Sequence, residues 1–202
     1  MVVRTVFAMT IAVTCVVTPA LAARLDGHSI AVVRVGRAGA ALDLKANVVS
    51  VLEFSRTGTA QLPKHTITLP HSLSSNNTGG LTLPGSSGIE GHLNLSTDGQ
   101  FLVLGGYDMV VDQPSAVTSR SDTYNRSLAI IPVATGTATV GPRLTDAFNN
   151  GSLRSVASNG SQFWTAGTGA SSISGVRYVA DSSATTSTLV NASAPRHTSR
   201  RS

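Results

Sequence analysis

The sequence predicts an all-β protein in which short strands are joined by tight turns. β-Branched and other apolar residues come in short bursts, and no window keeps the i, i+3, i+4, i+7 apolar spacing of an amphipathic helix. The bursts are separated by segments rich in Gly, Ser, Thr and Asn, which favour turns. Two of these turns, Asp98-Gly99 and Asn159-Gly160, contain dipeptides that accept the positive φ angles of tight hairpins.

The apolar bursts predict eleven strands. In chain order they are Ile30–Val35, Val48–Phe54, Thr66–Leu69, His92–Leu95, Phe101–Leu104, Ser127–Val133, Thr137–Val140, Leu153–Val156, Gln162–Ala166, Val176–Val179 and Thr188–Val190. Many short strands with turns at regular intervals are typical of a sandwich, a barrel or a propeller.

The two strongest hairpins have related surroundings, which indicates an internal repeat. The segments 91–105 and 151–167 are offset by about 60 residues, and each is followed by a further apolar strand and then by a Thr-rich strand. A repeated unit of four antiparallel strands is the pattern of a β-propeller blade. The leading region fits the last three strands of such a blade. We therefore expect an incomplete β-propeller-like array of four-stranded antiparallel blades, preceded by a signal-peptide helix.

The run Leu93-Asn-Leu-Ser-Thr-Asp-Gly-Gln-Phe-Leu102 resembles the inner hairpin of β-propeller repeat proteins. The segments 30–36 and 175–179 are similar to those of a group of secreted, uncharacterised β-propeller repeat proteins. The resemblance covers residues 25–190, about three blades. It implies the fold and supplies no catalytic residues.

The predicted organisation has five parts. Residues 1–22 are a signal peptide, 23–88 an incomplete first blade, 89–147 a second blade, 148–193 a third blade and 194–202 a basic disordered tail. Closed propellers have about four to eight blades, so three leave an open array. Its uncovered strand edges should make the chain marginally stable or prone to self-association. The simplest interpretation is a shortened product of a longer propeller.

The first residues predict export. Arg4 is followed by an uncharged apolar run from Val6 to Val17 and by the small-residue site Ala20-Leu21-Ala22, the pattern of a secretory signal peptide. A transmembrane helix would need about 20 apolar residues. We expect a secreted product, extracellular or periplasmic, with no membrane attachment after cleavage. The single cysteine, Cys15, lies in this segment, so no disulfide is expected in the mature chain.

The net charge of +5 does not predict a nucleic-acid partner. Several of the 15 basic residues lie at the two ends of the chain, whereas residues 24–195 are nearly balanced. A phosphate-binding surface needs clustered Lys and Arg, and the body of the chain has no such cluster in its sequence.

Candidate site residues are few. Glu90 and His92 would share one face of a strand by period-2 alternation, which makes them weak candidates for a polar site. The other histidines lack metal-ligand spacing, and the segment after Ile30 lacks the glycine pair of a dinucleotide site, so no metal or cofactor is expected. Asn76 and Asn125 are the best candidate glycan acceptors among the Asn-x-Ser/Thr sequons because they lie in polar loops.

The expected function is a non-catalytic binding or scaffold module, with an extracellular protein or glycan as partner. The aromatic cluster of Phe163, Trp164 and Tyr178 is either core packing or a stacking platform for a sugar ring. The alternative is an extracellular carbohydrate-active hydrolase or lyase on a propeller frame. Its paired acids would come from four positions: Glu90, Asp108, Asp112 and Asp146. The fold alone does not separate these functions.

Overall fold

The computed structural model describes residues 25–57, 62–170 and 174–191. The expected signal peptide and basic tail lie outside these residues. The described chain is all-β, with antiparallel sheets and no helix. Its strands are β1 (Ser29–Val35), β2 (Ala46–Ser55), β3 (His65–Thr68), β4 (Thr82–Pro84), β5 (Asn94–Leu95), β6 (Phe101–Tyr107), β7 (Arg126–Pro132), β8 (Thr139–Leu144), β9 (Leu153–Ser158), β10 (Phe163–Gly167), β11 (Gly175–Val179) and β12 (Thr188–Asn191).

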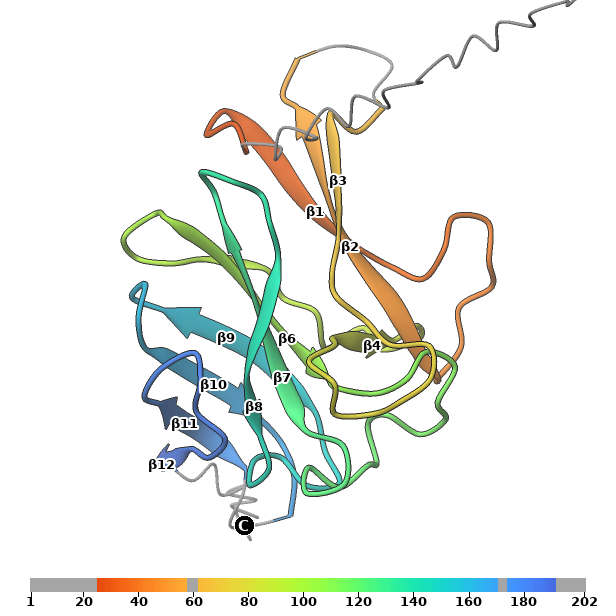
Figure 1. Cartoon of the computed structure of the whole chain (residues 1–202), viewed down its shortest axis with the longest axis vertical. Helices are drawn as coiled ribbons and strands as arrows, with labels where there is room; N and C mark the ends of the chain where they lie inside the picture. Colours follow the sequence, from red (N-terminus) through yellow and green to blue (C-terminus); the bar gives the residue numbers. More distant parts are fainter. Residues whose placement is uncertain (1–24, 58–61, 171–173, 192–202) are drawn as a thin grey trace, which may run out of the picture.

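Two groups of four strands pair in sequence order. Strands β5 to β8 form one antiparallel meander, and β9 to β12 form another (Figure 1). The Asp98-Gly99 turn joins the first two strands of one meander, and Asn159-Gly160 joins the first two of the other. Both glycines have a positive φ, 71° and 103°, as the hairpin prediction requires. The two predicted turns therefore occupy corresponding places in successive meanders.

The first group contains three strands, with β2 paired to β1 on one side and to β3 on the other. Strand β4 was not predicted from the sequence. It pairs with the start of β2 and, through Thr82 and Tyr107, with β6. This short strand joins the first group to the second in one eight-stranded sheet, whereas separate sheets were expected. Three residues that end in a proline carry too little alternation to predict a strand.

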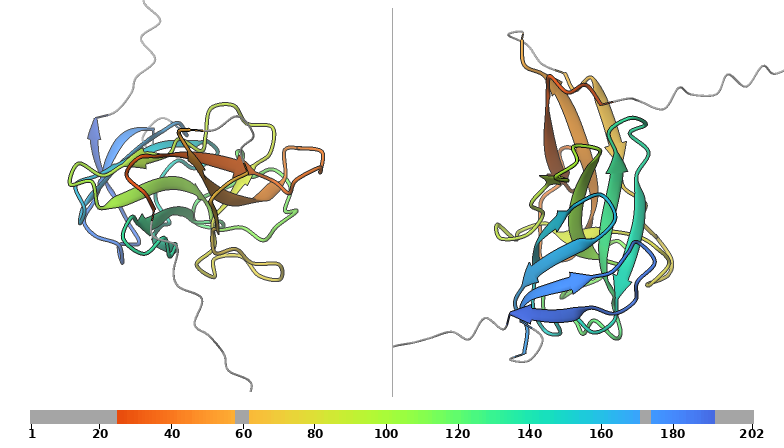
Figure 2. Two further views of the ribbon diagram at one scale, coloured as in Figure 1. Left: turned by 90° about the horizontal axis from the view of Figure 1, so that it is seen from above. Right: turned by 90° about the vertical axis from the view of Figure 1, so that its left-hand side faces the viewer.

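The three groups of strands follow one another across the molecule, with β6 to β8 between β1 to β3 and β9 to β12 (Figures 1 and 2). Strand β9 packs against β6 and β5. The Asn94 amide nitrogen donates to Ser155 Oγ at 3.1 Å and to the Val156 carbonyl at 2.8 Å. The Thr97 amide donates to the Ser158 carbonyl at 2.9 Å. The first strands of the two meanders are therefore joined by direct hydrogen bonds.

Apolar side chains fill the spaces on either side of the middle group. One core cluster includes Val49, Val51 and Ile67 from the first group with Leu104 from β6. Alternation explains this, because residues 49 and 51 of β2 point to one face of the sheet. The other cluster lies between the two meanders and includes Val103, Leu128, Leu153, Val156, Phe163 and Val179. Full burial of each such side chain contributes about 1.5–3 kcal/mol.

The sequence predicts burial of the apolar residues that flank the two hairpin turns: Leu93, Leu95, Leu102, Leu104, Ile130, Val156, Phe163 and Trp164. This prediction is only partly confirmed. Leu104, Val156 and Phe163 are buried, whereas Leu93, Leu102, Ile130 and Trp164 are half-buried. Leu95 is 57% exposed, so its predicted burial is wrong. Strand β5 contains only two residues and ends at Leu95, where the sheet no longer covers the side chain.

Candidate functional site

Glu90 lies in a polar cluster, but not for the reason the sequence suggested. Strand β5 begins at Asn94, so Glu90 and His92 precede it and strand alternation does not place them on one face. The His92 side chain is exposed, whereas Glu90 is half-buried. The Tyr107 hydroxyl, at the end of β6, donates a hydrogen bond to Glu90 Oε1.

Tyr107 joins Glu90 to a buried cation. Arg126, the first residue of β7, pairs directly with Tyr107 across the sheet. Its guanidinium carbon lies 4.6 Å from the centroid of the tyrosine ring, a cation–π contact. Burial raises the pKa of Tyr107, and the negative charge of Glu90 raises it further. The phenol is therefore neutral and its proton remains on the hydrogen bond to Glu90.

Arg126 is fully buried and holds two loops against β7. Burial lowers the pKa of its guanidinium, and the nearby groups of Tyr107 and Glu90 oppose this. The guanidinium donates to the backbone carbonyl oxygens of Ser119 (2.6 Å), Tyr124 (2.9 Å), Phe148 (2.9 Å) and Gly151 (3.2 Å). These acceptors satisfy the donors on Nη1 and Nη2, which offsets the cost of burying the guanidinium. Within the described chain, Arg126 Nε and Glu90 Oε2 are buried without a hydrogen-bond partner.

Asp108, the second acid of the predicted hydrolase set, is almost fully buried. Its carboxylate accepts the backbone amides of Thr78 (3.1 Å), Gly79 (2.9 Å) and Gly80 (2.9 Å). Arg143 Nη1 lies 3.7 Å from Asp108 Oδ2. This carboxylate organises the loop before β4.

Asp146 and Asp112, the other two acids of that set, lie in different surroundings. Asp146 accepts the Ser187 amide at 2.9 Å and Arg177 Nη2 at 3.1 Å, which ties the segment before β12 to the end of β8. Asp112 is exposed and has a positive φ of 68°. Glu90, Asp108 and Asp146 therefore each bind different partners, and Asp112 is exposed.

Glu53 is a further buried carboxylate, and it was not predicted from the sequence. Glu53 of β2 is 1% exposed and accepts hydrogen bonds from His65 Nδ1 at 2.6 Å and from the Asp26 amide at 2.7 Å. Burial alone would raise its pKa, but the hydrogen bonds from His65, Asp26 and Ser29 lower it. His65 of β3 lies beside Glu53 because of the register between β2 and β3. The pair could therefore not be recognised in the sequence without knowing how these strands pair.

The aromatic residues on β10 separate onto two faces of their sheet. Phe163 is buried in the core between the meanders. Trp164 and Tyr178 pair across β10 and β11 on the other face, where both are half-buried. Their ring centroids lie 5.8 Å apart at 57°, and Gln162 Nε2 donates to the Tyr178 hydroxyl at 2.6 Å. Phe163 is therefore a core residue, whereas the rings of Trp164 and Tyr178 lie at the surface.

The predicted glycan acceptors are both half-buried. Asn76 Oδ1 accepts the Val110 amide at 2.7 Å. The backbone of Asn125 is held by the Asn77 side chain and by the Asp108 amide. Glycosylation at Asn76 and Asn125 stays a prediction. Asn94 also lies in an Asn-x-Ser/Thr sequon, but the amide nitrogen that would carry a glycan donates to Ser155 Oγ and to the Val156 carbonyl of the neighbouring meander.

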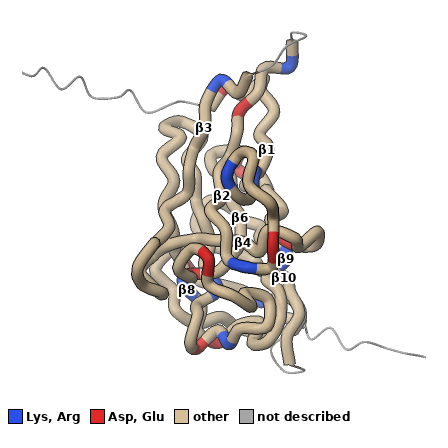
Figure 3. Tube along the Cα trace, turned by 90° about the vertical axis from the view of Figure 1, so that its right-hand side faces the viewer, with Lys and Arg blue, Asp and Glu red and all other residues tan. Residues whose placement is uncertain are grey.

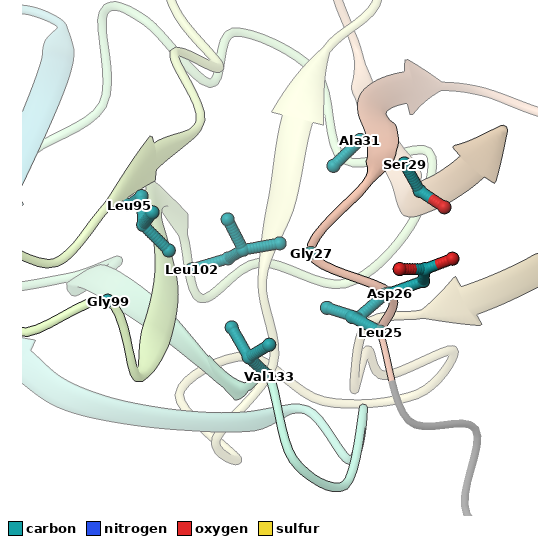
Figure 4. Close-up of a pocket in the computed structure, with 9 residues that line it drawn as sticks. All are labelled: Leu25, Asp26, Gly27, Ser29, Ala31, Leu95, Gly99, Leu102 and Val133. Atoms are coloured by element: carbon teal, nitrogen blue, oxygen red, sulfur yellow. The ribbon is translucent and has the colours of Figure 1, made fainter. Parts of the chain in front are cut away.

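An apolar cleft of about 180 Å³ lies between the segment before β1 and the β5–β6 hairpin (Figure 4). Leu25, Leu95, Leu102 and Val133 form its apolar lining. Asp26 and Ser29 supply polar groups on one side, and Asp26 pairs with Lys64 at 3.1 Å. The exposed side of Leu95 therefore faces a cleft between the first and second groups of strands.

Within residues 25–57, 62–170 and 174–191, no three His, Cys, Asp or Glu side chains lie close enough to hold a metal ion. The same residues contain no helix that is long and apolar enough to cross a membrane. No protein family, curated protein or solved structure matches this chain.

Proposed function

We propose that this chain is a secreted β-propeller-like module that binds or scaffolds an extracellular protein or glycan without catalysis. Two successive meanders with corresponding turns, packed first strand against first strand, support the propeller-like arrangement. The signal-peptide pattern supports secretion. N-terminal sequencing of secreted protein should give a chain beginning near Ala23, and a chain that retains Met1 in a membrane fraction would contradict this.

The proposal that the chain is not catalytic is supported by the hydrogen bonds of the buried Asp108 and the half-buried Asp146. Asp108 accepts three backbone amides, and Asp146 joins two elements through Ser187 and Arg177. A carboxylate used as a general acid or nucleophile needs access to a substrate oxygen or carbon. Carboxylates occupied by backbone amides act instead as structural acceptors.

The Trp164–Tyr178 pair supports a glycan as the partner. Aromatic rings at a surface offer apolar faces with a polar tip, and such rings are enriched where proteins bind ligands. The secreted full chain should be screened on a glycan array. Trp164→Ala should weaken the binding of any glycan found by about tenfold or more.

Tyr124→Ala is a matched control for Tyr178→Ala in this screen. Both tyrosines are half-buried, and in both a glutamine amide donates to the hydroxyl, from Gln113 in one case and Gln162 in the other. Loss of binding in the Tyr178 variant alone would support the platform. Equal binding by all variants would place the glycan elsewhere.

The hydrolase alternative rests on Glu90, whose second carboxylate oxygen has no partner within the described chain. Hydrolysis of glycans by the full chain, lost in Glu90→Gln and kept in Asp122→Asn, an exposed acid outside the predicted hydrolase set, would favour this alternative. The hydrolase alternative is contradicted if the parent chain hydrolyses no glycan. It is also contradicted if Glu90→Gln hydrolyses glycans as fast as the parent does.

Self-association through the uncovered ends of the array is part of the proposal. On the first group, Ile30 and Val32 are 52% and 42% exposed, and on the last group Leu189 and Val190 are 37% and 59% exposed. A single chain carries both ends, so copies can contact head to tail.

A further inference from the structure

Beside the exposed Ile30 and Val32 of β1, the same face of the first group of strands carries a basic cavity to which the proposed function assigns no role. Arg34 of β1 pairs directly with Ser50 of β2, and Ser50 pairs with Thr68 of β3. The three side chains therefore form one row across the sheet. An open cavity of about 250 Å³ lies over this row, bordered by the turn that contains Arg37 and by His71, which follows β3.

The cavity lining has an excess of positive charge. Arg34 and Arg37 both line it, and its lining contains no acidic side chain. An adjoining cavity shares Arg37 and is also lined by Asp43 and Asp112, two carboxylates that can compete with an anion for Arg37. Asp43 also pairs with Lys45 at 3.5 Å. Over the rest of the chain, acidic and basic residues are interspersed (Figure 3).

Arg34 has a donor with no acceptor. Its Nε atom is buried and has no hydrogen-bond partner in the described structure. A guanidinium keeps its charge at any physiological pH, so an unsatisfied buried Nε–H favours an anion that accepts from it. Arg37 is exposed at the mouth of the cavity and can turn toward the same anion.

Hydroxyl and imidazole groups complete the polar lining. Ser50 is 2% exposed, and its Oγ lies 3.4 Å from Thr68 Oγ1, where either hydroxyl can donate. His71 Nδ1 lies 2.9 Å from the Leu69 carbonyl oxygen. Because a carbonyl only accepts, His71 Nδ1 is the donor of this hydrogen bond, which fixes the imidazole ring at the edge of the pocket.

We propose that this cavity binds a sulfate or phosphate group. Tetrahedral oxyanions accept several hydrogen bonds at once, and an Arg fork presents parallel N–H donors to two of their oxygens. Arg34 supplies the buried Nε–H donor, Arg37 supplies charge at the mouth, and Ser50 and Thr68 supply hydroxyls. This site is independent of whether the three groups of strands form part of a propeller.

Isothermal titration of the full chain with sodium sulfate and sodium phosphate, in a chloride buffer, tests the proposal. We expect saturable binding with a Kd of about 1 mM or tighter. Arg34→Met should weaken binding by about tenfold or more, and Arg34→Lys should restore only part of it because a lysine lacks the fork. Arg154→Met, at an exposed arginine of β9, is the matched control and should bind like the parent.

A failure of the Arg34 variants to fold would also abolish binding, so Arg37→Ala serves as a second, independent variant of the same site. Arg37 lies in an exposed turn, so this variant should fold and bind the anion several-fold more weakly. Equal binding by the parent, Arg34→Met and Arg37→Ala would overturn the proposal. Saturation only above about 50 mM would also overturn it, since that is the behaviour of an adventitious ion.

A sulfated disaccharide and its desulfated counterpart distinguish the source of the anion. Tighter binding of the sulfated disaccharide than of inorganic sulfate assigns the site to a sulfate ester on a glycan. Equal or weaker binding assigns it to the free anion, and both results support the cavity as an oxyanion site. Equal binding of the desulfated sugar would contradict it.

Discussion

Gly160 lies directly against the carboxylate of Asp98, although 61 positions separate them in the chain. A Cβ atom added at Gly160 would meet Asp98 Oδ2 at 2.1 Å. The Asp98 side chain has little freedom to withdraw, because its Oδ1 accepts the Ser96 hydroxyl and the Gln100 amide. The turns of two successive meanders therefore pack against each other, and this contact can be measured by mutation.

Gly160→Ala should destabilise the chain by about 2–4 kcal/mol, because a positive φ of 103° and the contact with Asp98 both oppose a side chain. Gly99→Ala is the matched control. It has a φ of 71°, but an added Cβ there would meet nothing within 4 Å. It should cost only about 1 kcal/mol. Urea denaturation gives both values, and equal losses would show that the turns do not touch.

Arg126→Met should destabilise the chain by about 3–5 kcal/mol, because buried carbonyl oxygens lose their donor. Arg126→Lys should recover little, since an ammonium cannot reach acceptors on two loops. Arg154→Met at the surface should change stability by less than about 0.5 kcal/mol. An Arg126→Met chain within about 1 kcal/mol of the parent would contradict the role of this residue in holding the loops.

Glu53→Gln should lower stability by about 1–3 kcal/mol at pH 7, because its carboxylate is buried and accepts from His65 and Asp26. The hydrogen bonds from His65, Asp26 and Ser29 lower the pKa of Glu53 in the folded chain below its ordinary value in the unfolded chain. Its contribution is therefore full above the unfolded value and is lost as the pH falls through the folded value. The difference from the parent should narrow below about pH 4.

The surface variant Asp122→Asn is the control for this pH series. Asp122 pairs with Arg120 in an exposed position, so its loss should change stability little. A Glu53→Gln difference that stays constant down to pH 2 would show that the carboxylate charge is not what stabilises the fold.

Val32→Lys should reduce self-association of the full chain, because it places a charge on the exposed face of the first group of strands. Leu73→Lys is the control, since Leu73 is 69% exposed but lies in the loop between β3 and β4 rather than on β1. Sedimentation velocity over a concentration series gives the comparison. A parent chain that is well folded and strictly monomeric would contradict self-association through the ends of the array.

Strand positions and hairpin turns could be predicted from the sequence, because both depend on local patterns. Each of the eleven expected bursts overlaps a strand, and both predicted turns have glycine at positive φ. Strand β4 could not be predicted, because its pairing is set by β2 and β6 rather than by its own residues. The prediction that Leu95 is buried was wrong because it assumed a strand longer than β5, which contains only two residues.

The candidate sites were less predictable, because they depend on strand register. Glu90 was singled out by a strand alternation that does not exist, and its actual partner is Tyr107. The row of Arg34, Ser50 and Thr68 spans three strands, and only their pairing brings these residues together. In the sequence each is a single polar residue within or beside an apolar burst.

The most direct test of the central claim, that successive meanders pack first strand against first strand, is a through-hydrogen-bond NMR coupling in the full chain. The Thr97 amide donates to the Ser158 carbonyl of the next meander, whereas the Ser96 amide donates to Phe101 within its own hairpin. We expect a coupling from Thr97 nitrogen to Ser158 carbonyl carbon, with slow exchange of the Thr97 amide. A detected Ser96–Phe101 coupling without the Thr97–Ser158 coupling, and with fast exchange at Thr97, would show separate hairpins and contradict the account.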